Sequence, residues 1–283
     1  MNDLDLVIAY RIYPKVSKPT FIHEHDKLKL AQVCLSSLAQ SAASLRVRMH
    51  CICDGCPAEY IEMLRATIPP SWMVSFDQTD RIGNYKTFSR QIDFLKENVR
   101  NGAIAMFAED DYYYLPGALE SFVKLLAKNK DWDYATPYRH PDTETVDYWV
   151  AEIGRLNSGH RKEYRYVPST CLTFFVKDIS QFDPQFWKMY SRRFNDTPLW
   201  AALTLEHIRL LHYLIRASFR FDKSFIKIFV QSLVLKLFRC RVAGKLVEPL
   251  TNIATHAEIK FLATGIDWYR MAHSSSALTS LDK

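Results

Sequence analysis

The chain has 283 residues, of which 48% are hydrophobic and 24% are charged, and its formal net charge is +6. This length suits one large domain, or one domain with an extension, and the composition is that of a folded globular protein. The modest basic excess favours an anionic ligand or surface. Zinc-finger spacing, an RNP-like aromatic signature and a dense Lys/Arg block are all absent from the sequence, so we expect no nucleic-acid partner.

The first residues are acidic and lead directly into an apolar run at 6–10. They lack the basic start and long apolar segment of a signal peptide, and no stretch of eighteen apolar residues follows. We therefore expect no membrane span and a cytoplasmic location with reduced thiols. Cys51, Cys53 and Cys56 lie close together, but no second cysteine pair is nearby. This pattern favours small buried side chains over structural zinc.

Predicted strands and helices alternate over the first half of the chain. Strands are expected at 6–10, 46–53, 73–76 and 103–107, and helices at 27–38, 58–65, 84–98 and 116–127. Such alternation predicts an α/β fold in which helices cover both faces of a parallel sheet. Ligands bind beyond the carboxyl ends of the strands in sheets of this kind.

The second half is less regular, with short strands expected at 132–136, 148–153, 165–167 and 172–176 and helices from Pro198 onward. Residues 207–245 carry nine Lys or Arg and one acid, Asp222, with apolar residues between them. This basic amphipathic pattern is compatible with peripheral contact with an anionic membrane surface. The alternative, which is the more usual one, is a helix packed on the domain with a solvated basic face.

Three carboxylates in a row, Glu109-Asp110-Asp111, follow the apolar run that ends at 107. Carboxylates this close repel one another unless a cation neutralises them or water solvates them. Mg²⁺ and Mn²⁺ take oxygen ligands, typically one or two carboxylates together with substrate phosphates. The alternative is a solvated turn before a helix, where acids interact favourably with the helix dipole.

The segment 103–112, followed by Leu115-Pro116-Gly117, resembles the metal-binding segment of GT-A glycosyltransferases, especially the family-2-like group. The runs at 6–10, 52–55 and 83–88 resemble the first nucleotide-binding strand, the second strand and the loop before the metal motif. The resemblance covers roughly residues 4–200 and extends more weakly to 268. It implies a GT-A, Rossmann-like fold with a mostly parallel central sheet, a catalytic domain at 1–205, and a helical, basic C-terminal extension at 206–283 that completes the active site.

The resemblance also implies roles for individual residues. Asp111 would be the main ligand of Mn²⁺ or Mg²⁺, with Glu109 and Asp110 close to the ribose or behind the metal ligand. Asp54 would accept a hydrogen bond from the nucleobase, and Lys86 would reach the diphosphate; the alternatives are a turn-shaping Asp54 and a solvated Lys86. The remaining donor-binding residues implied are Tyr10 and Asn84. Because Asp54-Gly55-Cys56-Pro57 departs from the family's usual Asp and Ser run, the nucleotide is not identified.

Many GT-A enzymes end the catalytic region with a Thr-His pair whose histidine completes the metal shell, and Thr255-His256 resembles it. Neutral imidazole is an acceptable ligand for Mn²⁺, so His256 is the second expected metal ligand, with His273 next in order. The alternative is a histidine bonded to a backbone carbonyl. His207 and His212 are five residues apart, which is not the spacing of a helical metal pair, and we expect them to be structural.

Asp196 is the expected catalytic base. It lies between the acidic cluster and the Thr-His pair, as the base does in the family that the chain resembles. We expect it at a helix N-cap with Pro198 in the first turn, and the alternative is a cap without chemistry. Asp183 and Glu152 follow in order.

The function implied is metal-dependent, inverting transfer of a sugar from a nucleotide-sugar donor to a hydroxyl of a glycan or lipid-linked glycan, as in polysaccharide biosynthesis, at the inner face of the membrane. One alternative is a sugar nucleotidyltransferase, which normally has a Gly-rich loop after the first strand; here 11–15 contains no glycine. The other is a non-catalytic sugar-binding or membrane-surface module.

Overall fold

The computed structural model describes residues 4–15, 26–100, 102–128, 132–139, 142–156, 164–191, 193–238, 244–249 and 254–256. The first half alternates strictly between strand and helix until a short strand, β5, follows β4. The elements are β1 (Leu6–Ile12), α1 (Lys27–Ser41), β2 (Val47–Asp54), α2 (Ala58–Thr67), β3 (Met73–Thr79), α3 (Asn84–Asn98), β4 (Ile104–Glu109), β5 (Tyr112–Tyr114) and α4 (Ala118–Lys128). The eight elements expected in this half are confirmed.

The second half contributes short strands and a group of helices. They are β6 (Tyr134–Ala135), α5 (Asp142–Thr145), α6 (Asp147–Leu156), β7 (Tyr164–Tyr166), β8 (Phe174–Val176), α7 (Pro184–Trp187), α8 (Asp196–Thr204), α9 (His207–Phe219), α10 (Lys223–Phe238), β9 (Leu246–Pro249) and β10 (Ala254–His256). Among the described helices, none is both long and apolar enough to cross a bilayer.

Eight strands form the main sheet in the order β3-β2-β1-β4-β8-β6-β9-β7. The half made of β3, β2, β1 and β4 is parallel throughout, whereas the other half is mixed, with antiparallel β4–β8, β8–β6 and β9–β7 pairs. The α/β class is therefore confirmed. Strand β9, although it follows α10 in the chain, pairs parallel with β6 inside this sheet.

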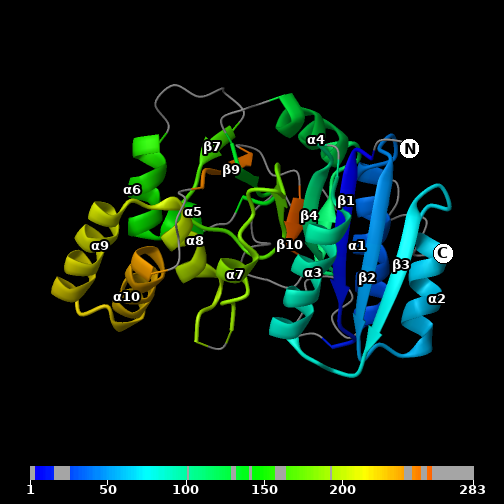
Figure 1. The fold of residues 1–283 in the computed structure, drawn as a ribbon, viewed down its shortest axis with the longest axis horizontal. Coiled ribbons are helices and arrows are strands. Elements are labelled where there is room, and N and C mark those ends of the chain that lie inside the picture. The colour runs from blue at the N-terminus through cyan, green and yellow to red at the C-terminus, as the bar shows by residue number, and fades with distance from the viewer. Residues whose placement is uncertain are drawn as a thin grey trace.

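Helices cover both faces of the sheet (Figure 1). Alternate side chains of β1 divide between two cores, because successive residues of a strand point to opposite faces. Leu6, Ile8 and Tyr10 pack with α1, α2 and α4, while Val7 and Ala9 pack with α3, α7 and α8. The position of a residue along β1 therefore decides which face of the sheet its side chain points to.

A third cluster joins α6 to α8, α9 and α10 through Tyr148, Trp149, Tyr213 and Phe229. It lies at the end of the molecule opposite β3 (Figure 1).

The strand expected at 148–153 is wrong, because these residues lie in helix α6. Tyr148, Trp149, Glu152 and Ile153 are buried while Val150 is exposed. Buried positions one, four and five residues apart follow a helix, not the two-residue period of a strand. Aromatic and β-branched residues at 148–150 favoured the strand interpretation, and packing against α9 and α10 outweighs that local preference.

Gln91 fastens α3 to the two central strands. Its buried side-chain amide donates hydrogen bonds to the Ala9 carbonyl of β1 at 2.7 Å and the Ala108 carbonyl of β4 at 3.1 Å. We expect Gln91→Leu to lower the free energy of unfolding in urea by about 1–3 kcal/mol, since both buried carbonyls lose a donor. The control Gln78→Leu, on an exposed β3 position, should change it by less than about 0.5 kcal/mol. Equal values for the two variants would contradict the role.

Candidate functional site

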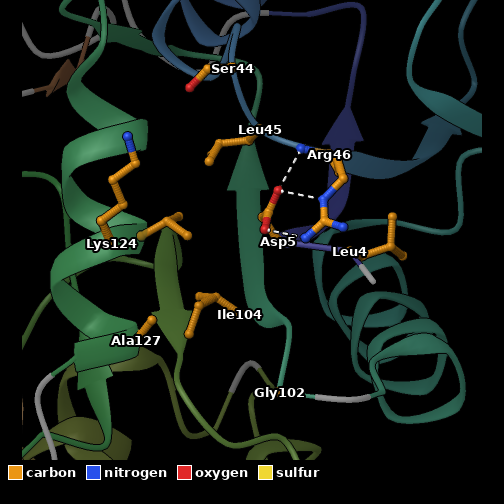
Figure 2. Close-up of a pocket in the computed structure, with 10 residues that line it drawn as sticks. Leu4, Asp5, Ser44, Leu45, Arg46, Gly102, Ile104, Lys124 and Ala127 are labelled. Atoms are coloured by element: carbon orange, nitrogen blue, oxygen red, sulfur yellow. Dashed lines mark hydrogen bonds and ion pairs between the residues drawn. The ribbon is translucent and has the colours of Figure 1, made fainter. Parts of the chain in front are cut away.

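One cavity of about 400 Å³ lies at the amino ends of β1, β2 and β4 (Figure 2). Its polar side chains include Asp5 and Arg46, which form a two-point ion pair with distances of 2.8 and 3.0 Å. This pair fastens the residues before β1 to those before β2. Because ligands of open α/β sheets bind at the carboxyl ends of the strands, this cavity is the weaker candidate.

Another cavity, of about 430 Å³, lies at the carboxyl ends of the same strands. The chain leaves β1 toward β2 and β3 on one side, and then crosses back to place β4 on the other side. The carboxyl ends of β1 and β4 therefore form a topological switch point, where ligand crevices of this fold class occur. The cavity volume is within the range of small-molecule sites.

Thirteen residues line this cavity, and they come from the ends of β1, β2 and β4, the loop after β3, and the starts of α1 and α3. They are Arg11, Ile12, Tyr13, Lys15, Lys27, Asp54, Arg81, Gly83, Asn84, Thr87, Glu109, Asp110 and Asp111. Four cations and four carboxylates thus face one space.

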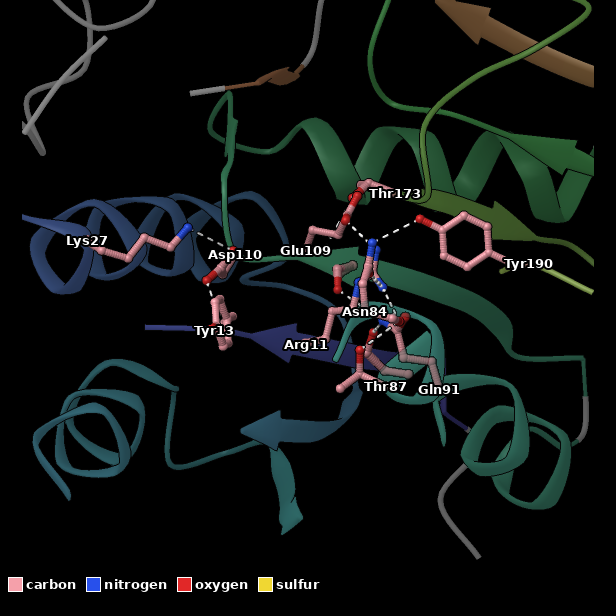
Figure 3. A network of polar contacts seen from close by, with 12 residues as sticks. Arg11, Tyr13, Lys27, Asn84, Thr87, Gln91, Glu109, Asp110, Thr173 and Tyr190 are labelled. Atoms are coloured by element: carbon pink, nitrogen blue, oxygen red, sulfur yellow. Dashed lines mark hydrogen bonds and ion pairs between the residues drawn. The ribbon is translucent and has the colours of Figure 1, made fainter. Parts of the chain in front are cut away.

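Arg11 is the central buried cation of the site. The sheet register places it opposite Glu109, and its guanidinium forms an ion pair with that carboxylate (Figure 3). The same guanidinium donates to the side-chain and backbone oxygens of Asn84 and lies over the Phe88 ring. Burial opposes the charged form, but the interactions with Glu109, Tyr190 and Asp111 together outweigh it and raise the pKa of Arg11.

Asp110 is paired on the opposite side of the sheet. Lys27, the first residue of α1, donates to its carboxylate at 3.0 Å, and the Tyr13 backbone N–H donates at 3.2 Å (Figure 3). Glu109 and Asp110 thus point to opposite faces, each toward its own cation. Two of the three clustered charges are neutralised by the protein itself, which explains how the run 109–111 is tolerated beside a buried strand.

Asp54, at the end of β2, is buried and holds the loop before α3. Its carboxylate accepts hydrogen bonds from the Thr79 hydroxyl at 2.7 Å and from the backbone N–H groups of Ile82 and Gly83 at 2.7 and 2.8 Å. Gly83 has φ +86°, a conformation that favours glycine. The structure therefore gives Asp54 the loop-shaping contacts that the sequence offered as the alternative to a nucleobase contact.

Gly55 is required by a close approach as well as by its backbone. Its φ is +65°, and a Cβ there would lie 2.3 Å from the Cγ of Arg81. Glycine therefore lets the Arg81 side chain cross the end of β2 and reach the cavity.

Helix α3 begins at the cavity, and the cap residue Gly83 provides no side chain. The positive end of the helix dipole and the first-turn N–H groups attract anions at such a site. Asn84 also donates to the Tyr190 hydroxyl at 2.9 Å, which connects the site to the segment after α7 (Figure 3).

Asp111 lines the cavity beyond the two paired carboxylates. Within the described ranges, no three or more histidine, cysteine or carboxylate side chains are grouped to enclose a metal ion. The residues therefore do not form an all-protein cage. They do fit a Mg²⁺ or Mn²⁺ ion held by one or two carboxylates and shared with substrate phosphates, the arrangement such ions commonly take.

Asp196 is half-buried at the start of α8, and its environment differs from that of the other carboxylates. Burial and the nearby negative charge of Glu109 raise its pKa to about 6. The helix N-cap is Asn195, so the expectation that Asp196 caps the helix is wrong; Asp196 is the first helical residue and accepts from the Thr197 N–H at 2.9 Å. Pro198 lies in the first turn, as expected.

Asp183 and Glu152, the acids expected to follow Asp196 as candidate bases, have structural contacts instead. Asp183 caps α7 by accepting from the N–H groups of Gln185 and Phe186, and Glu152 is buried against Arg209 and Tyr213. Asp196 has neither of these roles, and burial raises its pKa toward neutrality, but it does not itself line the cavity of about 430 Å³.

Three other expected site residues lie elsewhere or are described only in part. Tyr10 is buried in the core beneath α1, and its neighbour Arg11 lines the cavity instead. Lys86 is exposed on the first turn of α3 and does not line the cavity. The backbone of His256 pairs with Tyr112, the residue after Asp111, while its side chain lies outside the described part, as does His273.

Five site residues were missed by sequence reasoning: Arg11, Lys15, Lys27, Arg81 and Tyr190. Arg11 carried a usable signal, because a charged residue inside the apolar run at 6–12 must either be paired or lie at a strand end. Lys27, Arg81 and Tyr190 reach the site only through tertiary packing.

No protein-family model matches this chain, and no curated protein matches it significantly. Solved structures resemble it distantly. A mannosyltransferase from Pyrobaculum calidifontis, solved with GDP-Man and Mn²⁺, matches 84% of this chain and 71% of its own at 10% identity and a TM-score of 0.46. The galactosyltransferase LgtC matches 95% of this chain and 96% of its own, at 12% identity and 0.41. An inositol-1-phosphate CTP transferase from T. maritima matches 96% of each chain, at 10% and 0.42. Likenesses of this extent do not bear on the chemistry of the site.

The contacts of Asp54 distinguish loop support from nucleobase binding. We expect Asp54→Ala to lower the free energy of unfolding by about 2–4 kcal/mol, because two backbone N–H groups lose their acceptor. The control Asp77→Ala removes an exposed pairing with Arg90 and should lower it by less than about 1 kcal/mol. If urea titrations give Asp54→Ala the stability of the control, the loop-holding role is refuted and nucleobase contact remains.

Proposed function

We propose that this chain is a GT-A-type glycosyltransferase that moves a sugar from a nucleotide-sugar donor to an acceptor hydroxyl. The proposal depends on one observation: the cavity at the switch point of β1 and β4 combines carboxylates, cations and a helix N-terminus. The sequence resemblance of the segments at 6–10, 52–55, 83–88 and 103–119 supports the same function.

The diphosphate of the donor is proposed to lie between Lys15, Arg81 and the start of α3. No ion pair among the described residues involves Lys15 or Arg81, and both are exposed at the cavity, whereas Arg11 and Lys27 are engaged by carboxylates. Lys15 and Arg81 can therefore attract a phosphate without losing a protein partner. Tyr10, Asn84 and Lys86 remain proposed donor contacts, of which Asn84 alone lines the cavity.

Asp111 is proposed to hold Mn²⁺ or Mg²⁺ together with the donor phosphates, with His256 as a second ligand. When bound, the metal supplies positive charge to the departing diphosphate. Glu109 and Asp110 keep their cations, and so shape the cavity from behind Asp111.

Asp196 is proposed to accept the proton of the acceptor hydroxyl. The hydroxyl oxygen then bonds to the anomeric carbon, and the bond from that carbon to the phosphate oxygen breaks. The nucleoside diphosphate leaves toward Lys15, Arg81 and α3. Attack from the side opposite the leaving group inverts the configuration of the anomeric carbon. A glycan or lipid-linked glycan is the proposed acceptor.

A sugar nucleotidyltransferase is the second candidate, since its substrate also places phosphates at this edge of a sheet. The end of β1 argues against it, because residues 11–15 contain no glycine that would let the backbone wrap a triphosphate. A binding module without catalysis would release no nucleoside diphosphate from the donor, so a turnover assay distinguishes it from the enzyme.

The metal assignment is tested by thermal shift with UDP, GDP, CMP and dTDP, each with and without Mn²⁺. One nucleotide should raise the melting temperature, and more so with Mn²⁺, because ligands that bind only the native state stabilise it. Asp111→Ala should abolish the Mn²⁺-dependent part, whereas Asp80→Ala, an exposed acid that does not line the cavity, should retain it. An unchanged Mn²⁺ effect in Asp111→Ala would exclude Asp111 as the ligand.

The base assignment is tested by the pH dependence of nucleoside diphosphate release from the donor. A base works when deprotonated, so kcat/KM should fall about tenfold per pH unit below the pKa of about 6 and level off above it. Asp196→Asn should lose a factor of roughly 100 or more in turnover while donor binding survives. Because its folded pKa is raised, ionised Asp196 disfavours the folded state as pH rises through 4 to 6, so Asp196→Asn should be no less stable at neutral pH.

The matched control is Asp183→Asn, at the cap of α7. Asn caps a helix about as well as Asp, so this variant should keep wild-type turnover and pH dependence. Near wild-type turnover in Asp196→Asn would remove Asp196 from the mechanism.

A further inference from the structure

The turn between α9 and α10 presents two phenylalanines to solvent. Phe219 is 82% exposed and Phe221 is 86% exposed, which is unusual for large apolar side chains of a folded domain. The turn lies at the end of the molecule opposite β3, away from the candidate site (Figure 1).

Phe221 has an unfavourable backbone conformation as well as an unfavourably exposed side chain. Its φ is +53°, in the left-handed region that bulky residues avoid and glycine accepts. The turn is fixed by hydrogen bonds from the N–H of Phe221 to Ser218 at 3.1 Å and from the N–H of Asp222 to Ala217 at 3.0 Å. A residue that is unfavourable on both counts, at a position where glycine would relieve both, indicates a function for its ring.

Exposed apolar residues also occur on both helices, along α9 and at the end of α10 away from the turn. On α9 they recur at helical spacing, opposite the buried Leu210, Tyr213 and Ala217: Ile208, Leu211, Ile215 and Phe219. On the second half of α10 the exposed apolar residues are Val230, Val234, Leu237 and Phe238. We call these eight exposed residues of α9 and α10, together with Phe221, the apolar ridge.

Three arginines of this region are paired within the protein, so its solvated basic face is smaller than the sequence pattern indicates. Arg209 pairs with Glu152, while Arg216 and Arg220 pair with Asp147, all across to α6. Among the described residues next to the turn, the cations without an ion pair are Lys223 and Lys227, both exposed on α10. The nearby acid Asp222 is half-buried and accepts from the Phe225 N–H at the start of α10.

We propose that the apolar ridge docks onto an anionic lipid bilayer, with Phe219 and Phe221 inserted at the headgroup boundary and Lys223 and Lys227 against the headgroups. The complementarity of lysines beside protruding rings favours this partner, since a bilayer accepts apolar side chains and anionic headgroups attract the cations. A second copy of the chain would bring the same lysines toward each other. The inference concerns a surface distinct from the donor site and does not depend on the proposed reaction.

The test is cosedimentation of the purified chain with vesicles of phosphatidylcholine alone or of phosphatidylcholine and phosphatidylglycerol in equal parts. Binding should be much stronger to the mixed vesicles and should fall as salt rises, because the headgroup attraction is screened. Equal recovery with both vesicle types would overturn the proposal. Because no nucleotide enters this assay, its failure leaves the glycosyltransferase proposal untouched.

Phe221→Gly separates docking from folding. It removes the ring and relieves the left-handed backbone, so its melting temperature should equal or exceed that of the parent, while its vesicle affinity should fall about tenfold. The matched control Met73→Ser removes an exposed apolar side chain from β3, at the other end of the molecule, and should retain the parent's affinity. Equal affinities for these two variants would refute the role of Phe221.

Lys223→Gln and Lys227→Gln should each weaken binding to the mixed vesicles about fivefold, and Lys128→Gln on the exposed end of α4 should not. Sedimentation velocity without vesicles provides the remaining check. A chain that is dimeric and becomes monomeric on Phe221→Gly would show that a second copy covers the ridge, and the bilayer proposal would be overturned.

Discussion

The placement of Arg11 opposite Glu109 constrains the whole candidate site. A guanidinium and a carboxylate at the buried ends of adjacent strands must stay together, because separating them would leave an uncompensated charge away from water. The pair therefore fixes the carboxyl ends of β1 and β4 relative to each other, and the hydrogen bonds of Arg11 to Asn84 fix the start of α3 to the same point. Lys27 and Asp110 form the corresponding pair on the other face of the sheet.

Because some charges of the cavity are paired within the described part of the protein and others are not, they have two different roles. The cations deepest in the site are already engaged, so they contribute shape and rigidity, whereas Lys15 and Arg81 at the exposed side remain available to a charged ligand. Among the carboxylates, Glu109 influences Asp196 through its negative charge and so connects the sheet ends to α8. This order of contacts, from a fixed interior to an available rim, would let the proposed site bind a polyanion without rearranging the carboxylate proposed as its base.

The first half of the fold could be predicted from the sequence because its apolar periods are long and its turns carry Gly and Pro. The acidic cluster and Asp54 could be located for the same reason, since they directly follow apolar strands. Arg11, Lys27 and Tyr190 could not, because their roles depend on register and on packing between segments far apart in the chain. Residues 148–153 were misjudged because the aromatic run there favours a strand locally, and only contact with α9 and α10 makes it a helix. Likewise, the arginines of α9 form a basic pattern in the sequence, but in the structure they form ion pairs with acids of α6.

Strand β9 gives the sheet a particular order of assembly. It lies between β6 and β7, yet more than a hundred residues separate it from β6 in the chain. The parallel half from β1 to β4 is complete in the chain by Glu109, although its β1–β4 pairing already joins residues as distant as Leu6 and Ile104, whereas the mixed half can close only after Leu246–Pro249 has been synthesised. Contacts this distant in sequence form slowly, because loop closure must precede the energy they release. During synthesis on the ribosome, the edges of β6 and β7 therefore stay open until the last part of the chain emerges, and this interval is when the protein is most dependent on protection from aggregation.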